Sequence, residues 1–244
     1  MIRLIVLDFD GTLMPYGAHA VSEMVKSLLR SAIERGVTVA VSSGRTYGEL
    51  SSYLSALAED IWFICCDGAY AVKNGRAHYE RKMEAEDLRL FEKNRSAASS
   101  LVLHGAFGNY TIGDTPDEAS RFTAVPVSRI DDIKEKIFKV TSYGLRMRLP
   151  PYCGLRTHWD GGVNESAQFV NRFANKGTAL SDLQSRLMLT KFETACLGDS
   201  GNDIAMMHNA KISVCVGDRS EELKKVCTHH TATIEDALKS ILLS

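Results

Sequence analysis

The chain has 244 residues, 45% of them hydrophobic, which suits one large or two modest globular domains. A formal net charge of -1 and the lack of a long Lys/Arg block argue against nucleic-acid or anionic-membrane partners. No apolar run approaches the roughly 20 residues of a membrane span, and the first strand begins too early for a cleavable signal. We expect a cytoplasmic protein with small-molecule partners and leave its oligomeric state open.

The first predicted element is a buried strand over Ile2–Leu7, which runs into Asp8-Phe9-Asp10-Gly11-Thr12-Leu13. Because side chains alternate along a strand, Asp8 and Asp10 point to the same side, and Gly11 permits a close backbone approach. Two carboxylates so placed are costly unless a cation binds them or one keeps a proton. The pair therefore indicates a Mg²⁺ site, a general acid, or both.

A parallel α/β sheet is predicted next, from a helix over Val21–Arg35 followed by a strand over Val37–Val41. Ligands of such sheets bind beyond the carboxyl ends of the strands. Ser43 and Gly44 lie at such an end and precede a predicted helix over Thr46–Leu57, so a hydroxyl and backbone N–H groups could bind an anion there. Taken alone, Ser43 is better explained as an ordinary helix N-cap.

The middle of the chain changes character after a third strand, Ile61–Cys66, and a hairpin over Tyr70–Tyr79 that an Asn-Gly turn predicts. Beyond about Lys82, strands gather around only two expected helices, Glu84–Ala98 and Asp131–Val140, as in a separate α+β unit. The expected strands are Leu101–His104, Tyr110–Ile112, Thr123–Val127, Gly144–Leu149 and Ala167–Asn171.

We interpret residues 83–171 as a cap inserted into a core formed by residues 1–82 and 172–244. A cap that closes over the leaving group would carry the specificity. The cap candidates for substrate contact are Arg146, Arg148, His158 and Trp159. The two arginines are two apart on a predicted strand and share a face, which is either solvent or the cleft. The last two lie in an irregular stretch.

The alternation resumes at Lys176, which opens a helix over Ala179–Leu189 and, taken alone, is better explained as a solvated lysine. The next strand, Phe192–Leu197, runs into Gly198-Asp199-Ser200-Gly201-Asn202-Asp203. Asp199 and Asp203 are four apart and face the same spot if the turn begins a helix. The remaining predicted elements are the strand Ile212–Val216 and the helices Glu221–Cys227 and Ile234–Leu243.

Polar residues at four strand ends together supply a nucleophile, a proton carrier, anion donors and metal ligands. They are Asp8, Asp10, Ser43, Lys176, Asp199 and Asp203. This set suits phosphoryl transfer, and the chain lacks the G-x-x-x-x-G-K-[ST] loop that cradles a nucleotide. In this order the motifs resemble the haloacid dehalogenase superfamily of phosphohydrolases. The segments Ser43-Gly44-Arg45 and Asp67-Gly68-Ala69, the hairpin and the large insert resemble its Cof-type subfamily.

The resemblance covers the core and implies a Rossmann-like, doubly wound parallel sheet with an inserted α+β cap. It implies that Asp8 forms an aspartyl-phosphate and that Asp10 protonates the leaving oxygen and then activates water. The implied phosphate-binding residues are Ser43, Gly44, Lys176 and Asn202. The implied Mg²⁺ ligands are Asp8, the Asp10 backbone carbonyl, Asp199 and Asp203.

The chain departs from the subfamily pattern in three places. Asp67 stands where Asn is usual and places an acid near the mouth of the site, where it would repel a second anionic group on the substrate. Asp218 likewise stands where Asn is commoner. The pair His229 and His230 replaces the usual sequence before the last helix, and we expect both at the surface rather than on a metal.

The sequence thus predicts a Mg²⁺-dependent phosphatase acting on a small phosphorylated metabolite, with a sugar phosphate favoured. A sugar phosphomutase of the same superfamily and a non-catalytic phospholigand-binding protein are the alternatives. A mutase must retain a bisphosphate with a strongly cationic cap, and the cap has no dense cluster beyond Arg146 and Arg148. Against a binding protein, every motif position carries a chemically competent residue.

Overall fold

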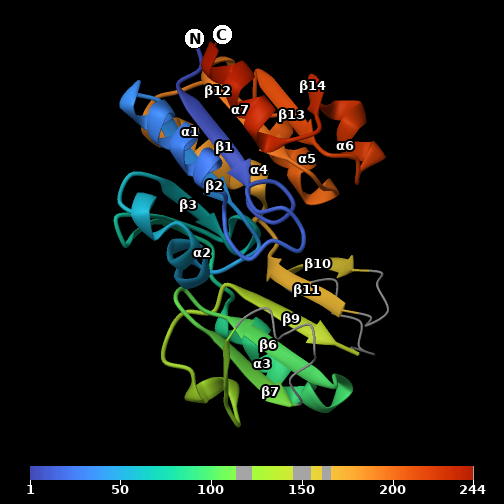
Figure 1. The fold of residues 1–244 in the computed structure, drawn as a ribbon. Helices are drawn as coiled ribbons and strands as arrows, with labels where there is room; N and C mark the ends of the chain where they lie inside the picture. Colours follow the sequence, from blue (N-terminus) through green and yellow to red (C-terminus); the bar gives the residue numbers. More distant parts are fainter. Residues whose placement is uncertain (114–122, 145–154, 161–165, 244) are drawn as a thin grey trace.

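The computed structural model describes residues 1–113, 123–144, 155–160 and 166–243, which form two sheets (Figure 1). The strands of the larger sheet are β1 Leu4–Asp8, β2 Thr38–Ser42, β3 Trp62–Cys65, β4 Tyr70–Lys73, β5 Arg76–Glu80, β12 Thr194–Gly198, β13 Ile212–Val216 and β14 His229–Thr231. Their order is β14-β13-β12-β1-β2-β3-β4-β5. All pairs from β14 to β3 are parallel, and β4 and β5 form an antiparallel hairpin at the edge.

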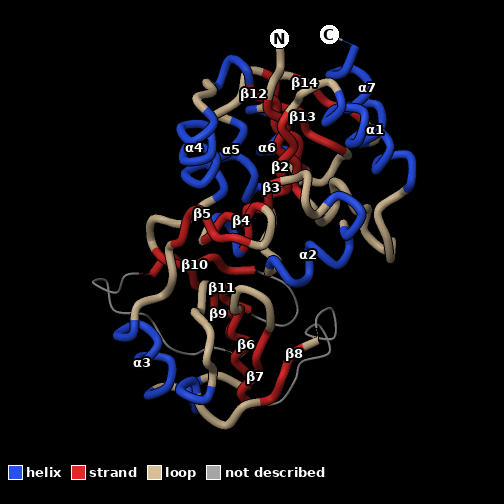
Figure 2. The backbone as a smooth tube through the Cα atoms, turned by 90° about the vertical axis from the view of Figure 1, so that its left-hand side faces the viewer, coloured by secondary structure: helices blue, strands red, loops and turns tan. Residues whose placement is uncertain are grey.

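Helices cover both faces of the larger sheet. They are α1 Glu23–Glu34, α2 Tyr47–Tyr53 and α7 Ile234–Leu243 on one face, and α4 Lys176–Leu187, α5 Ile204–Met207 and α6 Glu221–Val226 on the other. Figure 2 shows α1 and α7 on one side of the strands and α4 and α5 on the opposite side. In β1, Ile5 and Leu7 pack towards α1 and α7, while Leu4 and Val6 pack towards α4 and α5. Because successive side chains of a strand point to opposite faces, this apolar strand needs cover on both. The predicted doubly wound α/β fold is confirmed.

Local signals set several boundaries, among them the predicted helix end at Gly36 and the predicted Asn-Gly hairpin. The Ser22 hydroxyl caps α1 by accepting from the Val25 N–H, and Gly36 follows the helix with φ +78°. In the β4–β5 hairpin, Asn74 and Gly75 both have positive φ (52° and 68°), as a type I′ turn requires.

The smaller sheet lies entirely within the segment predicted to be a cap. Its strands are β6 Ser100–His104, β7 Asn109–Gly113, β8 Ala124–Pro126, β9 Lys139–Tyr143, β10 Leu155–Asp160 and β11 Ser166–Asn171, in the order β10-β11-β9-β6-β7-β8. One face buries Leu103, Val140 and Phe169 against Phe91 of α3, Ala85–Lys93. That this segment is a separate domain with the predicted boundaries stays a prediction.

The predicted helix Asp131–Val140 is wrong: a short 3-10 turn, Ile130–Asp132, leads through irregular chain into β9. The apolar side chains Ile130, Ile133 and Ile137 have a helical spacing, but they reach the buried face of the smaller sheet without a helix. Strand β9 is hydrogen-bonded to β6 on one side and β11 on the other, and this non-local pairing overrides the local pattern.

Other predictions have mixed outcomes. His158 and Trp159 lie in strand β10, not in an irregular stretch, and Arg146 and Arg148 fall outside the described residues. Strand β14, which was not predicted, carries the exposed His229. His230 beside it is also exposed, so the surface placement of both is confirmed. Within the described ranges, no helix is both long and apolar enough to cross a bilayer.

The two sheets touch through Tyr70 of β4. Its ring stacks on Phe138 with centroids 4.1 Å apart, and its hydroxyl donates to the Ala106 carbonyl (2.8 Å) beyond β6. The same hydroxyl accepts from the Tyr47 N–H (2.7 Å) at the start of α2. One buried side chain therefore joins the insert to the helix that follows the Ser43 segment.

We expect Phe91→Ala to lower the free energy of unfolding by about 3–5 kcal/mol. The substitution removes the ring contact with Phe169 (centroids 5.1 Å apart) and leaves a cavity in the apolar cluster. Urea denaturation measures this loss. Arg89→Ala on the exposed side of α3 is the control and should cost under about 1 kcal/mol. Similar losses for the two variants would contradict the packing of α3 on the smaller sheet.

Candidate active site

The candidate site lies where the strand order of the larger sheet reverses, between β1 and β12. Asp8 is the last residue of β1, and Asp199 directly follows β12. Loops at the carboxyl ends of parallel strands diverge at such a switch point and leave a crevice. The 3-10 turn Gly201–Asp203 then brings Asp203 back to the same place.

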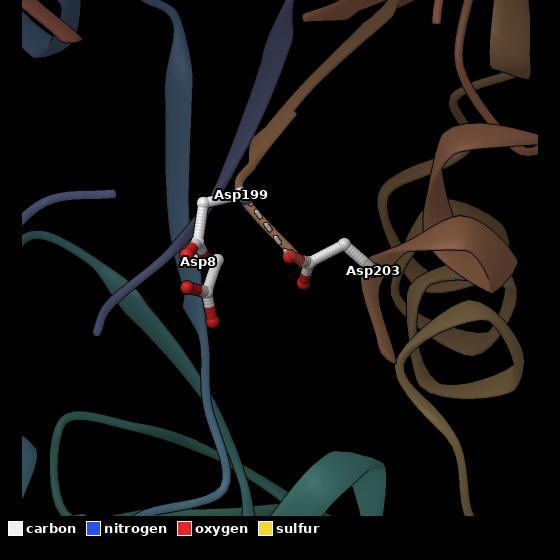
Figure 3. Close-up of side chains that lie close together, drawn as sticks. All are labelled: Asp8, Asp199 and Asp203. Carbon is white, nitrogen blue, oxygen red and sulfur yellow. Dashed lines mark hydrogen bonds between the residues drawn. The ribbon is translucent and has the colours of Figure 1, made fainter. Parts of the chain in front are cut away.

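Three buried carboxylates meet there (Figure 3): Asp8, Asp199 and Asp203 each offer an oxygen, and these oxygens lie within 4.8 Å of one another. Asp203 is held by its own turn, because its Oδ2 accepts from the backbone N–H groups of Asp199 and Ser200 (both 3.1 Å). The prediction that Asp199 and Asp203 face the same spot is confirmed.

Lys176, the first residue of α4, is 1% exposed and bridges two of these carboxylates. Its Nζ donates to Asp8 Oδ1 (2.5 Å) and to Asp203 Oδ1 (2.7 Å). The start of α4 comes this close because Gly68, with φ +88°, has no side chain: a Cβ there would lie 2.2 Å from the Asn175 carbonyl oxygen. Lys176 is therefore a buried ion-pair partner and not a solvated lysine.

The cluster holds more negative charge than Lys176 can balance. Burial raises the pKa of the Asp8 carboxyl well above its ordinary value, an effect that Lys176 opposes and Asp203 reinforces. Burial and the neighbouring Asp203 also raise the pKa of Asp199. These directions mean that ionising all three carboxylates is unfavourable without a further positive charge.

The donor set fits a hard cation. Asp199 Oδ1 is buried and accepts no hydrogen bond from the described residues, while its Oδ2 accepts from the Tyr16 hydroxyl (3.0 Å). A buried oxygen without a donor is costly, and carboxylate oxygens are the ligands that Mg²⁺ prefers. Gly11, at φ +86°, leaves space for this group, since a Cβ there would lie 2.3 Å from Asp199 Oδ2. Asp8, Asp199 and Asp203 could thus hold Mg²⁺.

Asp10 lies apart from this cluster and is paired with Arg45. The guanidinium donates from Nε to Asp10 Oδ2 (2.8 Å) and from Nη2 to Oδ1 (2.7 Å), and it lies 3.6 Å from Glu49 Oε1. Such a bidentate pair fixes the carboxylate in orientation as well as position. In the sequence Arg45 appeared only as part of the Ser43-Gly44-Arg45 motif, and its pairing with Asp10 was not predicted.

The predicted phosphate-binding residues lie around the same opening. Ser43 is buried, and its Oγ accepts from the Arg45 N–H (3.2 Å). The N-cap of α2 is Thr46, so the alternative of Ser43 as that cap is wrong. Asn202 is exposed, and its Oδ1 accepts from the Ser200 hydroxyl (2.7 Å).

A cavity of about 290 Å³ separates the two sheets at this point. From the predicted site it is lined by Asp8, Asp10, Ser43, Gly44 and Asn202. From the smaller sheet it is lined by His104, Lys139, Thr141, Tyr143, Ser166 and Gln168. Lys176 and Asn202 also line an adjoining cavity of about 750 Å³. None of the smaller-sheet residues in these walls was a predicted site residue.

Comparison with known proteins identifies the family. A family model for haloacid dehalogenase-like hydrolases matches residues 5–241. The chain belongs to this family. It is 23% identical to the 5-amino-6-(5-phospho-D-ribitylamino)uracil phosphatase of Bacillus subtilis, over 97% of this chain and 93% of that protein. It is 25% identical to the HMP-PP phosphatase of Escherichia fergusonii, over 94% of this chain and 89% of the relative.

Solved structures share the fold. A sugar phosphatase of HAD subclass IIB superposes with a TM-score of 0.82 at 18% identity, covering 99% of this chain and all of the other. The chain is thus a haloacid dehalogenase-like hydrolase, as its motifs predicted.

We expect Lys176→Met to lower the free energy of unfolding by about 3–5 kcal/mol in the absence of metal, because it leaves Asp8 and Asp203 buried without their cation. Chemical denaturation in EDTA measures the loss. Lys211→Met, at an exposed position, is the matched control and should change stability little. A Lys176→Met variant as stable as the control would show that this ion-pair network does not support the fold.

Proposed function

We propose that the protein is a Mg²⁺-dependent phosphatase that hydrolyses a small phosphorylated metabolite, with a sugar phosphate favoured, through an aspartyl-phosphate on Asp8. The observation that carries this proposal is the convergence of Asp8, Asp199 and Asp203 within 4.8 Å, with one buried Asp199 oxygen that no described residue donates to. When bound, Mg²⁺ would neutralise the charge that the phosphoryl oxygens and Asp8 bring together.

The first half-reaction transfers the phosphoryl group to Asp8. A carboxylate oxygen of Asp8 bonds to phosphorus, the bond from phosphorus to the leaving oxygen breaks, and Asp10 gives that oxygen a proton. Ser43 Oγ, the Gly44 backbone, Lys176 Nζ and Asn202 would hold the phosphoryl oxygens. Lys176 already contacts Asp8, so it lies where negative charge would develop.

The second half-reaction restores Asp8. Asp10 takes a proton from water, the water oxygen bonds to phosphorus, and the bond from phosphorus to Asp8 breaks, which releases inorganic phosphate. The two bonds from Arg45 fix the orientation of the Asp10 carboxylate.

A polar substrate suits the cavity. Its lining of hydroxyl, amide and charged side chains favours a leaving group rich in oxygen. The name of one solved relative points the same way, since it is a sugar phosphatase. The two curated relatives are named for a phosphoribitylamino-uracil and for HMP-PP. A phosphomutase would need a spare cation for a second phosphate. Lys139, the cation that the smaller sheet places in the described cavity wall, is already paired with Asp67 (3.0 Å).

We expect Asp8→Asn to abolish phosphate release from p-nitrophenyl phosphate with the fold intact, because the amide is nearly isosteric but cannot attack phosphorus. A phosphate assay measures the loss of turnover, and circular dichroism checks that the variant is folded. Asp182→Asn, on the partly exposed side of α4, is the control and should keep wild-type turnover. Wild-type turnover by a folded Asp8→Asn variant would contradict the assignment of Asp8 as the nucleophile.

We expect Mg²⁺ to support turnover, EDTA to abolish it and Ca²⁺ to inhibit it. Ca²⁺ takes more oxygen ligands at longer distances, which would engage both oxygens of Asp8 and block its attack. Calorimetric titration should show one Mg²⁺ site that Asp199→Asn weakens. Equal turnover in EDTA would refute the metal requirement, and equal turnover in Ca²⁺ would refute this account of the site.

A further inference from the structure

One face of the smaller sheet supplies the cavity wall opposite the carboxylates. Lys139, Thr141 and Tyr143 alternate along β9 and so share a face, while Val140 between them packs into the apolar cluster on α3. On the neighbouring strands, His104 is in register with Lys139, and Gln168 with Thr141. This polar face lines the cavity together with Asp8 and Asp10 of the carboxylate side.

Lys139 is the cation of this face and is 5% exposed. Its Nζ donates to Asp67 Oδ2 (3.0 Å) and to the Gly44 carbonyl (2.9 Å). Burial alone would lower the pKa of Lys139, but the Asp67 carboxylate outweighs burial and raises it, so the group is an ammonium. An ammonium has three donors, and the described residues accept from two of them.

His104 beside Lys139 adds no charge. Burial, together with Lys139, lowers the pKa of His104 to about 3, so its ring is neutral. Both ring nitrogens are engaged, Nδ1 with Asn109 Oδ1 (2.7 Å) and Nε2 with Thr141 Oγ1 (2.9 Å). The charge on this wall, among the described residues, therefore rests with Lys139.

Asp67 is fixed by its backbone. It has φ +56°, and its N–H donates to the Ser43 carbonyl (3.0 Å), while the Cys66 N–H donates to the Arg45 carbonyl (2.9 Å). The turn after β3 is thus tied to the Ser43 segment, and its carboxylate sits against Lys139. Opposite charges 3.0 Å apart largely cancel at the distance of a bound ligand.

We propose that Lys139 and Asp67 are a specificity-determining pair: Lys139 donates its third N–H to a neutral oxygen of the leaving group, and Asp67 cancels the charge that would attract a second anionic group. The inference rests on the proposed function, because it concerns the leaving group of that reaction. The Lys139–Asp67 pair would thus select hydroxyl-bearing monophosphates over substrates that carry a carboxylate or a second phosphate.

Binding of a matched ligand pair tests the proposal. Sorbitol 6-phosphate and 6-phosphogluconate differ only at carbon 1, a hydroxymethyl group in one and a carboxylate in the other. Calorimetry with Mg²⁺ in an Asp8→Asn background measures both dissociation constants without turnover. We expect the parent to bind sorbitol 6-phosphate more tightly.

Two substitutions should then act in opposite directions. Asp67→Asn keeps the shape and tolerates positive φ, and it should shift the ratio of dissociation constants about tenfold or more towards 6-phosphogluconate by exposing the charge of Lys139. Lys139→Met should weaken sorbitol 6-phosphate binding about 10- to 100-fold, as expected for the loss of a charged donor, and shift the ratio away from 6-phosphogluconate. Lys136→Met, an exposed lysine paired with Glu80 outside this cavity, is the control and should leave the ratio unchanged.

A ratio within about twofold of the parent in Asp67→Asn, or failure of the parent to bind either ligand, would overturn the inference. Melting temperatures check that each variant is folded. The proposed function fails separately, if the wild-type chain with Mg²⁺ releases no phosphate from p-nitrophenyl phosphate.

Discussion

The buried ammonium of Lys176 holds together a cluster that would otherwise repel itself. Asp8 comes from β1, and Asp203 follows β12, so Lys176 joins the ends of two neighbouring central strands at the point where the strand order reverses. Burial makes this arrangement costly, and the ion pairs are favourable only while every partner stays in place. The glycines around the cluster serve the same constraint, since Gly68 lets α4 approach and Gly11 makes room for Asp199. Stability and chemistry thus depend on the same few side chains.

The two faces of the smaller sheet have different roles, one in packing and one in lining the cavity. Towards α3 it buries aromatic and aliphatic side chains, which stabilise the sheet. Towards the larger sheet its described residues present hydroxyls, an amide, a neutral histidine and the ammonium of Lys139. The strands that carry the polar face are held in place by the apolar packing on their other face. Contacts of Tyr70 of β4 with Phe138 and the Ala106 carbonyl hold them as well. The cavity wall can therefore be polar while the strands that carry it are held by apolar packing on their other face.

Most of the carboxylate site could be predicted because it follows from local patterns. An apolar run that ends in an acid is recognisable in sequence, and parallel strands bring such ends together at one edge. Asp8, Asp199 and Asp203 were found in this way, as was the α/β fold. Lys139 could not be found, since the residues before it have a helical spacing and only pairing with β6 and β11 makes it part of a strand. Arg45 was quoted in a motif, but its bond to Asp10, 35 residues earlier, has no local signature.

The position of Lys139 at the start of β9 limits how this segment can change in evolution. The strand is paired on both edges, so an insertion or deletion of one residue within it would turn Lys139, Thr141 and Tyr143 towards α3 and bring Val140 to the cavity. A change of two residues would keep the faces but move the ammonium by about 7 Å along the strand, away from Asp67. Homologous chains with a different leaving group should therefore differ by substitution within β9 and by length only in the loops that flank it.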